Sequence, residues 1–259
     1  MILKGNLFSQ ELEMETSISI LSSDNKDSAP YRVIYLLHGL CGRSGDWIDY
    51  TMLPVFAKEY NAIFIMPEVA RSFYSDMKFG LNYFTYITEE LPQICKKTFN
   101  ISQEKKDTYI IGASMGGYGA LKCALSKPEN YNTCCAFSSP CLFLKDDLER
   151  SNGALKFREL YGESLFNDFQ AIFGEDIQWN SKDDVIELAR RLSKKTNKPR
   201  IYLSCGKDDF LLNDNRRYYK ILKDLDYDIE FNELEGNHNW QYFNETLEHS
   251  LKYCFPKDK

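Results

Sequence analysis

Short apolar runs alternate with longer segments in which apolar residues recur at helical spacing. The runs that predict strands lie at residues 12–20, 31–37, 62–67, 108–112, 133–138, 200–205 and 228–233. The segments that predict helices lie at about 52–60, 82–98, 115–125, 215–225 and 239–254. Most strand runs are continuously apolar, which is typical of parallel strands buried on both faces. Residues 12–20 instead alternate apolar and polar side chains, which indicates a half-exposed strand.

This order predicts an α/β fold with a mostly parallel sheet, an antiparallel N-terminal edge and helices on both faces. We expect residues 1–259 to form a single domain. About sixty residues between the strands near Phe137 and Ile201 exceed what one crossover helix requires. We interpret about 141–180 as a lid or cap insertion, because insertions after parallel strands overlie the usual ligand crevice. An elaborated surface layer is the alternative.

Charge and cysteine content narrow the classes of function. The 32 Lys and Arg against 38 Asp and Glu give a net charge of −6, which argues against a nucleic-acid partner. The eight cysteines show no Cys-x-x-Cys spacing, so we expect no metal ion, and we expect no cofactor. No apolar segment is long enough for a membrane span, and the N-terminus lacks a secretory apolar region. We therefore expect a reduced, cytoplasmic protein, and the sequence does not decide between a monomer and a homo-oligomer.

The segment Gly112-Ala113-Ser114-Met115-Gly116 follows a predicted strand and opens a predicted helix. This context is typical of the Gly-x-Ser-x-Gly nucleophile elbow, in which a strained turn presents a serine hydroxyl beside a helix N-terminus. A serine hydroxyl needs a base to take its proton. We expect Ser114 to be a catalytic nucleophile.

The chain has only three histidines, which limits the choice of base. In this fold the triad members follow the order Ser, Asp or Glu, His, and His38 precedes the serine. His249 falls within the last predicted helix, whereas His238 follows the strand that ends near Leu234. We therefore predict that His238 is the base and that His38 is a structural residue of its loop.

The acid should come from the end of the strand before His238, where Asp208 and Asp209 are adjacent. Spacing alone leaves both open. An oxyanion needs two backbone N–H donors. We assign one to Met115, which follows the nucleophile, and the other to Leu40 in the loop 38–42. Gly39, Trp47 and Trp240 are candidates for the substrate pocket because they lie close in sequence to these residues.

At these positions the chain resembles the esterase D-type α/β-hydrolases, which include S-formylglutathione hydrolases, antigen 85 mycolyltransferases and feruloyl esterases. The segments that carry the resemblance are Leu36-Leu37-His38-Gly39-Leu40, residues 112–119, Gly206-Lys207-Asp208-Asp209-Phe210 and Gly236-Asn237-His238. Within this group the chain is most similar to bacterial tributyrin esterases. The resemblance implies an α/β-hydrolase fold, assigns the triad acid to Asp209, and places the oxyanion donors at Leu40 and Met115.

The expected function is hydrolysis of short-chain acyl esters by a serine carboxylesterase through an acyl-enzyme intermediate, with a small-molecule ester as partner. An S-formylglutathione-type thioesterase is one alternative, and a feruloyl or acetyl-carbohydrate esterase is another. A catalytically inactive binding protein on the hydrolase scaffold is an alternative from a different class.

Overall fold

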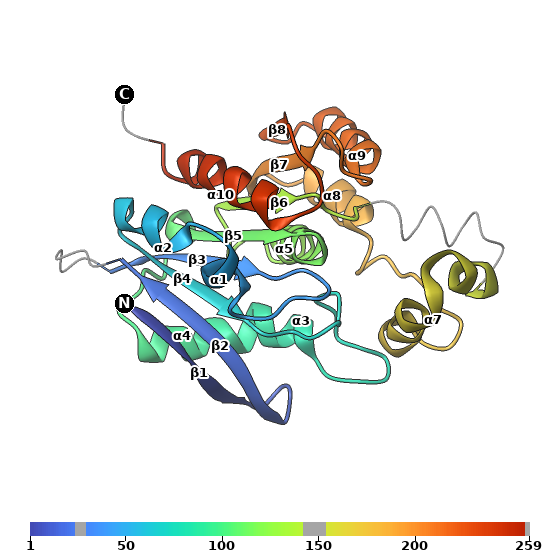
Figure 1. Cartoon of the computed structure of the whole chain (residues 1–259), viewed down its shortest axis with the longest axis horizontal. Helices are drawn as coiled ribbons and strands as arrows, with labels where there is room; N and C mark the ends of the chain where they lie inside the picture. Colours follow the sequence, from blue (N-terminus) through green and yellow to red (C-terminus); the bar gives the residue numbers. More distant parts are fainter. Residues whose placement is uncertain (24–29, 142–153, 257–259) are drawn as a thin grey trace.

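An eight-stranded sheet runs through the computed structural model, which describes residues 1–23, 30–141 and 154–256 (Figure 1). The strands lie in the order β1-β2-β4-β3-β5-β6-β7-β8. β1 pairs antiparallel with β2, and β2 with β4, whereas all later pairs are parallel. Their bounds are β1 Ile2–Ser9, β2 Met14–Ser22, β3 Arg32–Leu37, β4 Ala62–Pro67, β5 Thr108–Ala113, β6 Thr133–Phe137, β7 Arg200–Gly206 and β8 Ile229–Leu234.

Helices cover both faces of the sheet, so the apolar side chains on each face are buried in a separate core. One face carries α1 (Asp46–Tyr50), α2 (Leu53–Phe56) and α10 (Trp240–Cys254). The other carries α3 (Tyr83–Thr85), the π-helical turn Tyr86–Glu90, α4 (Leu91–Thr98), α5 (Met115–Ser126), α8 (Val185–Ser193) and α9 (Leu212–Asp224). Short 3-10 turns occupy Ala57–Glu59 and Lys105–Asp107.

The predicted fold class is confirmed, and each predicted strand lies within about two residues of an observed one. β1 was not predicted as a separate strand, because most of its side chains are exposed at the sheet edge and follow no core pattern. The helix predicted over 52–60 is confirmed, but it is divided into α2 and the 3-10 turn Ala57–Glu59. α1 ends at Tyr50, and α2 begins anew at Leu53 with Pro54 in its first turn, before the chain passes into a 3-10 turn.

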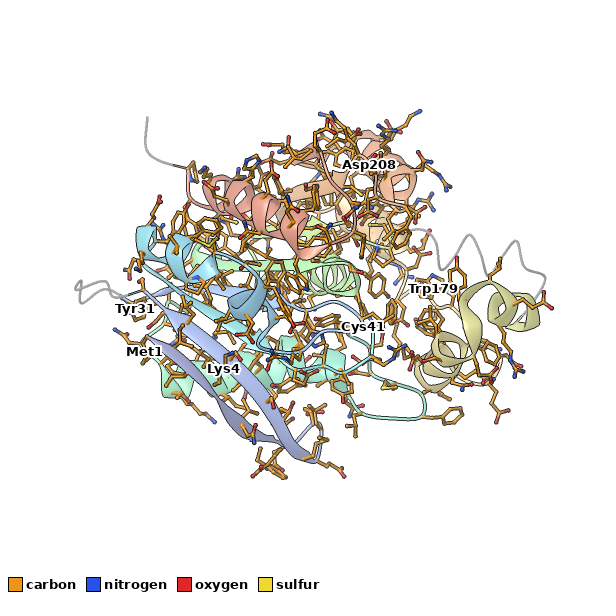
Figure 2. The ribbon with its side chains drawn as sticks, viewed as in Figure 1. Met1, Lys4, Tyr31, Cys41, Trp179 and Asp208 are labelled. Carbon is orange, nitrogen blue, oxygen red and sulfur yellow. The ribbon has the colours of Figure 1, made fainter. Side chains whose placement is uncertain are left out.

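The insertion carries a long helical element, α7 (Ala154–Phe173), whose helix is broken at Gly162 with a φ of 80°. Backbone hydrogen bonds from Lys78 and Phe79 to Ile172 and Ala171 join its C-terminal end to the loop after β4. Trp179 then packs between Phe173 and Tyr118 of α5, at the junction of the insertion with the body (Figure 2). Part of the segment predicted as a lid, 142–153, lies outside the described residues, and its role as a lid stays a prediction.

Gly116 allows the first turn of α5 to press against the end of β3. A Cβ at this position would lie 2.3 Å from the Leu37 carbonyl oxygen and 2.7 Å from that of His38. Both atoms are backbone atoms, so they cannot rotate away. The sheet and the helix therefore meet at a distance that only glycine permits.

We predict that Gly116→Ala lowers the free energy of unfolding by about 3 kcal/mol, although alanine is normally the better helix former. Urea denaturation followed by circular dichroism measures this change. Gly5→Ala on the exposed strand β1 is the control, because nothing lies within 4 Å of the added Cβ. It should stay within about 0.5 kcal/mol of the wild type. Equal stability of the two variants would contradict the prediction.

Candidate active site

Ser114 occupies the sharp turn that joins β5 to α5. Its backbone has a φ of 56° and a ψ of −124°, a conformation that a non-glycine residue adopts only under strain. Gly112 makes the turn possible, because a Cβ there would lie 2.1 Å from the Gly116 carbonyl oxygen. The serine thus projects from the carboxyl end of the sheet at the N-terminus of α5.

Three side chains from three loops meet at this point in a chain of two hydrogen bonds. His238 Nε2 lies 2.9 Å from Ser114 Oγ, and His238 Nδ1 lies 2.9 Å from Asp209 Oδ2. With Nδ1 donating to the carboxylate, Nε2 is the acceptor for the serine proton. The structure therefore brings together Ser114, His238 and, of the two candidate aspartates, Asp209.

Of the two adjacent aspartates, only Asp209 faces the histidine. Asp209 is 6% exposed, whereas Asp208 points outward at the surface (Figure 2). Burial raises the pKa of the Asp209 carboxyl, but hydrogen bonds from His238 and from the Leu211 N–H outweigh it, so the pKa lies below its usual range. The carboxylate stays charged and can hold the imidazole in the required tautomer.

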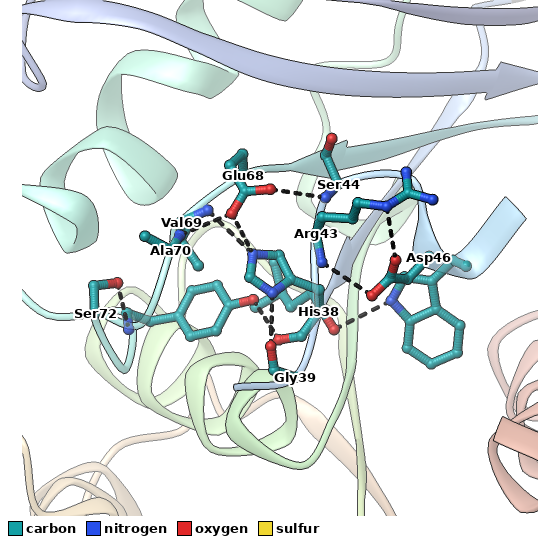
Figure 3. Close-up of polar contacts among 12 residues, drawn as sticks. His38, Gly39, Arg43, Ser44, Asp46, Glu68, Val69, Ala70 and Ser72 are labelled. Carbon is teal, nitrogen blue, oxygen red and sulfur yellow. Dashed lines mark hydrogen bonds and ion pairs between the residues drawn. The ribbon is translucent and has the colours of Figure 1, made fainter. Parts of the chain in front are cut away.

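The loop that follows β3 is held rigid by a network around His38 (Figure 3). The His38 ring donates from Nδ1 to the Gly39 carbonyl at 2.8 Å, and its Nε2 accepts from the Val69 N–H at 3.1 Å. The Tyr74 hydroxyl donates to the His38 carbonyl at 2.9 Å. Glu68 accepts from the Ser44 N–H on the far side of the loop. His38 is thus a buried structural residue of this loop.

This rigid loop lies directly against the serine. A Cβ on Gly39 would be 3.5 Å from the Ser114 Cβ, and Leu40 follows it. No hydrogen bond from the Leu40 N–H occurs in the described part of the chain. Met115 is the first residue of α5, so its N–H has no partner within the helix. Both amides are available to an oxyanion beside Ser114.

Two hollows meet at Ser114. The wider one, about 730 Å³, is lined by residues of the loop 39–43 and by Tyr50, Phe210, His238 and Trp240. The other, about 410 Å³, is mainly apolar and is lined by Phe73, Met115, Pro140, Tyr161, Leu165 and Leu211 among others. Leu40, Ser114 and Phe210 belong to both.

Of the two predicted pocket tryptophans, the structure places only Trp240 on the wall of a hollow. Trp47 is 0% exposed and lies behind Trp240, with ring centroids 5.3 Å apart, and its indole N–H donates to the Leu37 carbonyl at 3.2 Å. It faces the core because α1 packs its apolar side onto the sheet. Gly39 also lines the wider hollow, and its role in a substrate pocket stays a prediction.

Comparison with known proteins identifies the family. A family model described as "Putative esterase" matches residues 9–254. An acetyl esterase of Caldicellulosiruptor saccharolyticus is 30% identical, with 97% of each chain covered. The chain belongs to this esterase family and is a carboxylic ester hydrolase. The alternative of a protein without enzymatic activity is therefore not supported.

Two further proteins are similar to this esterase, one in sequence and one in fold. The S-formylglutathione hydrolase of Rattus norvegicus is 25% identical, with 95% of this chain and 91% of that protein covered. A solved structure of the fluorophosphonate-binding serine hydrolase F of Staphylococcus aureus superposes with a TM-score of 0.85 at 24% identity, with 99% of both chains covered. The structural likeness confirms the α/β-hydrolase fold.

Two residues beside the candidate site were not predicted from the sequence: Phe210, which lines both hollows, and Glu68, which supports the loop after β3. The Phe210 ring is 78% exposed, and its centroid lies 4.9 Å from that of His238. The position of Phe210 next to Asp209 in the sequence could have indicated that it lies close to the site. The direction of a side chain in a turn depends on tertiary structure, however, and cannot be predicted from this position. Glu68 follows the C-terminal end of β4. It accepts from the nearby Ala70 N–H and also from the Ser44 N–H, which belongs to a loop distant in sequence.

No helix in the described segments is both long and apolar enough to cross a membrane. Across the same segments, no group of three or more His, Cys, Asp or Glu residues could hold a metal ion.

Asp209 should give the esterase a distinct dependence of stability on pH. Because the folded-state pKa is depressed, its stabilisation is complete above its ordinary pKa of 3.8 and is lost as the pH falls through the lower folded value. We predict that Asp209→Asn loses less stability than the wild type on acidification from about pH 5 to about pH 3. Urea denaturation across this range tests it.

Asp208→Asn is the matched control, because its carboxylate is exposed and does not bond to His238. This variant should follow the wild-type dependence. The same pH dependence in Asp209→Asn and wild type would show that the His238 and Leu211 bonds do not keep the carboxylate charged.

Proposed function

We propose that this esterase is a serine carboxylesterase that hydrolyses short-chain acyl esters with Ser114, His238 and Asp209 as its triad. The observation that carries the proposal is the unbroken hydrogen-bond chain from Ser114 through His238 to Asp209, two bonds of 2.9 Å each. The strained backbone of Ser114 and the rigid loop beside it support the same assignment. Seven of its eight free cysteines are buried, which fits the reducing cytoplasm as its compartment.

In the proposed reaction, Ser114 Oγ attacks the ester carbonyl carbon while His238 Nε2 takes its proton. The carbonyl oxygen becomes an oxyanion, and the Leu40 and Met115 amides donate to it. The imidazolium, stabilised by Asp209, then protonates the departing alcohol. Water repeats the sequence on the acyl-enzyme and releases the carboxylic acid.

Because His238 must protonate the leaving alcohol, the alcohol half of the substrate is assigned to the wider hollow and the acyl half to the apolar hollow. The alcohol oxygen must leave close to His238, and His238 lines the wider hollow only. The acyl chain must then extend toward the apolar hollow, which Met115 lines and to which α7 contributes Tyr161 and Leu165. Its volume of about 410 Å³ exceeds what an acetyl methyl group fills. We infer that chains longer than acetyl are accepted and that α7 limits their length.

Similarity to the rat S-formylglutathione hydrolase supports a second candidate, a thioesterase with the same triad. Comparing kcat/KM for S-formylglutathione with that for acetyl and butyryl esters separates the two. A much higher value for the thioester would replace our first proposal.

The two histidines after Ser114 offer a matched test of the triad. We predict that Ser114→Ala and His238→Ala each lower kcat for p-nitrophenyl butyrate by about 10⁶-fold, because each removes a member of one unit. Ser114→Ala should also lose labelling by a fluorophosphonate. His249→Ala, at a half-buried position on α10, should retain wild-type turnover. Near-normal activity of Ser114→Ala in a folded protein would refute the assignment.

Leu165 provides a test of the acyl hollow. Leu165→Trp should narrow the hollow and move the preferred p-nitrophenyl ester toward acetate, with a loss of about tenfold in kcat/KM for butyrate relative to acetate. Leu160→Trp is the control, because Leu160 is 58% exposed on the same helical element and lines neither hollow. An unchanged chain-length profile in Leu165→Trp would place the acyl chain elsewhere.

A further inference from the structure

A third hollow, about 350 Å³, lies between the C-terminal half of α5 and α8, and it shares no residue with the two hollows at Ser114. α8 packs beside α5 on the sheet face opposite α10 (Figure 1). The apolar walls of the hollow are formed by Phe84, Leu125, Pro128, Leu188 and Leu192. These walls can cover a short hydrocarbon chain.

A buried ammonium group forms part of this hollow. The Lys122 side chain is only 3% exposed, and its Nζ donates to Asp183 Oδ1 at 2.5 Å and to Ser75 Oγ at 2.6 Å. The Phe84 ring lies 5.2 Å from the same nitrogen. An ammonium has three N–H donors, so these two oxygens leave one unused. The Asp183 charge is balanced within the site.

The rim of the hollow carries unbalanced positive charge. Lys182, Arg191 and Lys195 are exposed and form no ion pair within the described residues. The remaining carboxylate, Asp76, accepts from the N–H and the hydroxyl of Thr85. The hollow is therefore lined by three cations without an ion-pair partner in the described part of the chain and by one further carboxylate, that of Asp76. This local excess of positive charge contrasts with the net charge of −6 of the whole chain. Charge complementarity points to an anionic ligand.

We propose that this hollow binds an amphipathic carboxylate, a small organic acid with a short apolar tail. Arg191 and Lys195 hold the carboxylate at the rim, where the planar guanidinium can donate two parallel hydrogen bonds. The tail lies along Leu125, Leu188 and Leu192. Strong binding requires both the charged rim and the apolar walls. An inorganic anion would leave the apolar walls in contact with water, and a neutral hydrocarbon chain would leave the rim charges without a partner.

Isothermal titration of the full chain with hexanoate tests the site. We expect saturable binding that weakens at high salt, because the rim charges are exposed and screened. 1-Hexanol and inorganic phosphate should each bind at least about tenfold more weakly, since each lacks one half of the ligand. Binding of 1-hexanol as tight as that of hexanoate would overturn the proposal.

Variants then separate this hollow from those at Ser114. Arg191→Ala with Lys195→Ala should weaken hexanoate binding about tenfold. The control is Lys96→Ala with Lys97→Ala, which removes two exposed cations of α4 that do not line the hollow and should leave binding unchanged. Ser126→Phe, at the end of α5, should fill the hollow and abolish binding. Equal affinities of the Arg191–Lys195 double variant and the control would refute the site, whatever the other variant does.

Discussion

The backbone of Ser114 is the constraint on which the rest of the site depends. A φ of 56° in a non-glycine residue costs on the order of 1–3 kcal/mol, and it persists only where surrounding packing fixes it. Here that packing comes from glycines: Gly112 and Gly116 bring β5, α5 and β3 so close together that a side chain at either position would strike backbone atoms. The strain is therefore offset by the burial of the sheet and helix around it. The strained turn affects one side chain in particular, because it makes the Ser114 hydroxyl project beyond the edge of the sheet.

The parallel sheet then determines what can reach that hydroxyl. β3, β5, β7 and β8 all end at the same edge, so the loops that follow them supply the Leu40 amide, Ser114, Asp209 and His238 side by side. Two of these loops are secured independently. The His38 ring, with both nitrogens engaged, fixes the loop after β3, while the Leu211 N–H and His238 together fix the Asp209 carboxylate. The hydrogen-bond chain is thus assembled from separately rigid parts.

The sequence predicted those features that depend on chain order and on backbone geometry. Ser114 followed from the glycines around it, and His238 from the scarcity of histidines and the order of elements. Asp208 and Asp209 could not be separated by spacing, because neighbours in a turn differ only in the direction of their side chains, which β7 and the Leu211 amide set. Trp47 lies close in sequence to the site but faces the core, since three-dimensional packing decides which side of α1 is buried. β1 carries too few buried side chains to leave a pattern.

In the proposed reaction, chemistry and specificity have different structural origins. The positions of the oxyanion amides and of His238 fix where the carbonyl oxygen and the leaving oxygen lie, and both come from loops at the edge of the sheet. Only one direction remains for the acyl chain, and it leads to a wall made partly by α7. α7 belongs to the insertion between β6 and β7 and is joined to the body through the loop after β4 and through Trp179. Under the proposed reaction, changes in α7 would therefore alter the size of the acyl hollow without moving Ser114, His238 or Asp209, so that one scaffold could accommodate different esters around the same three residues.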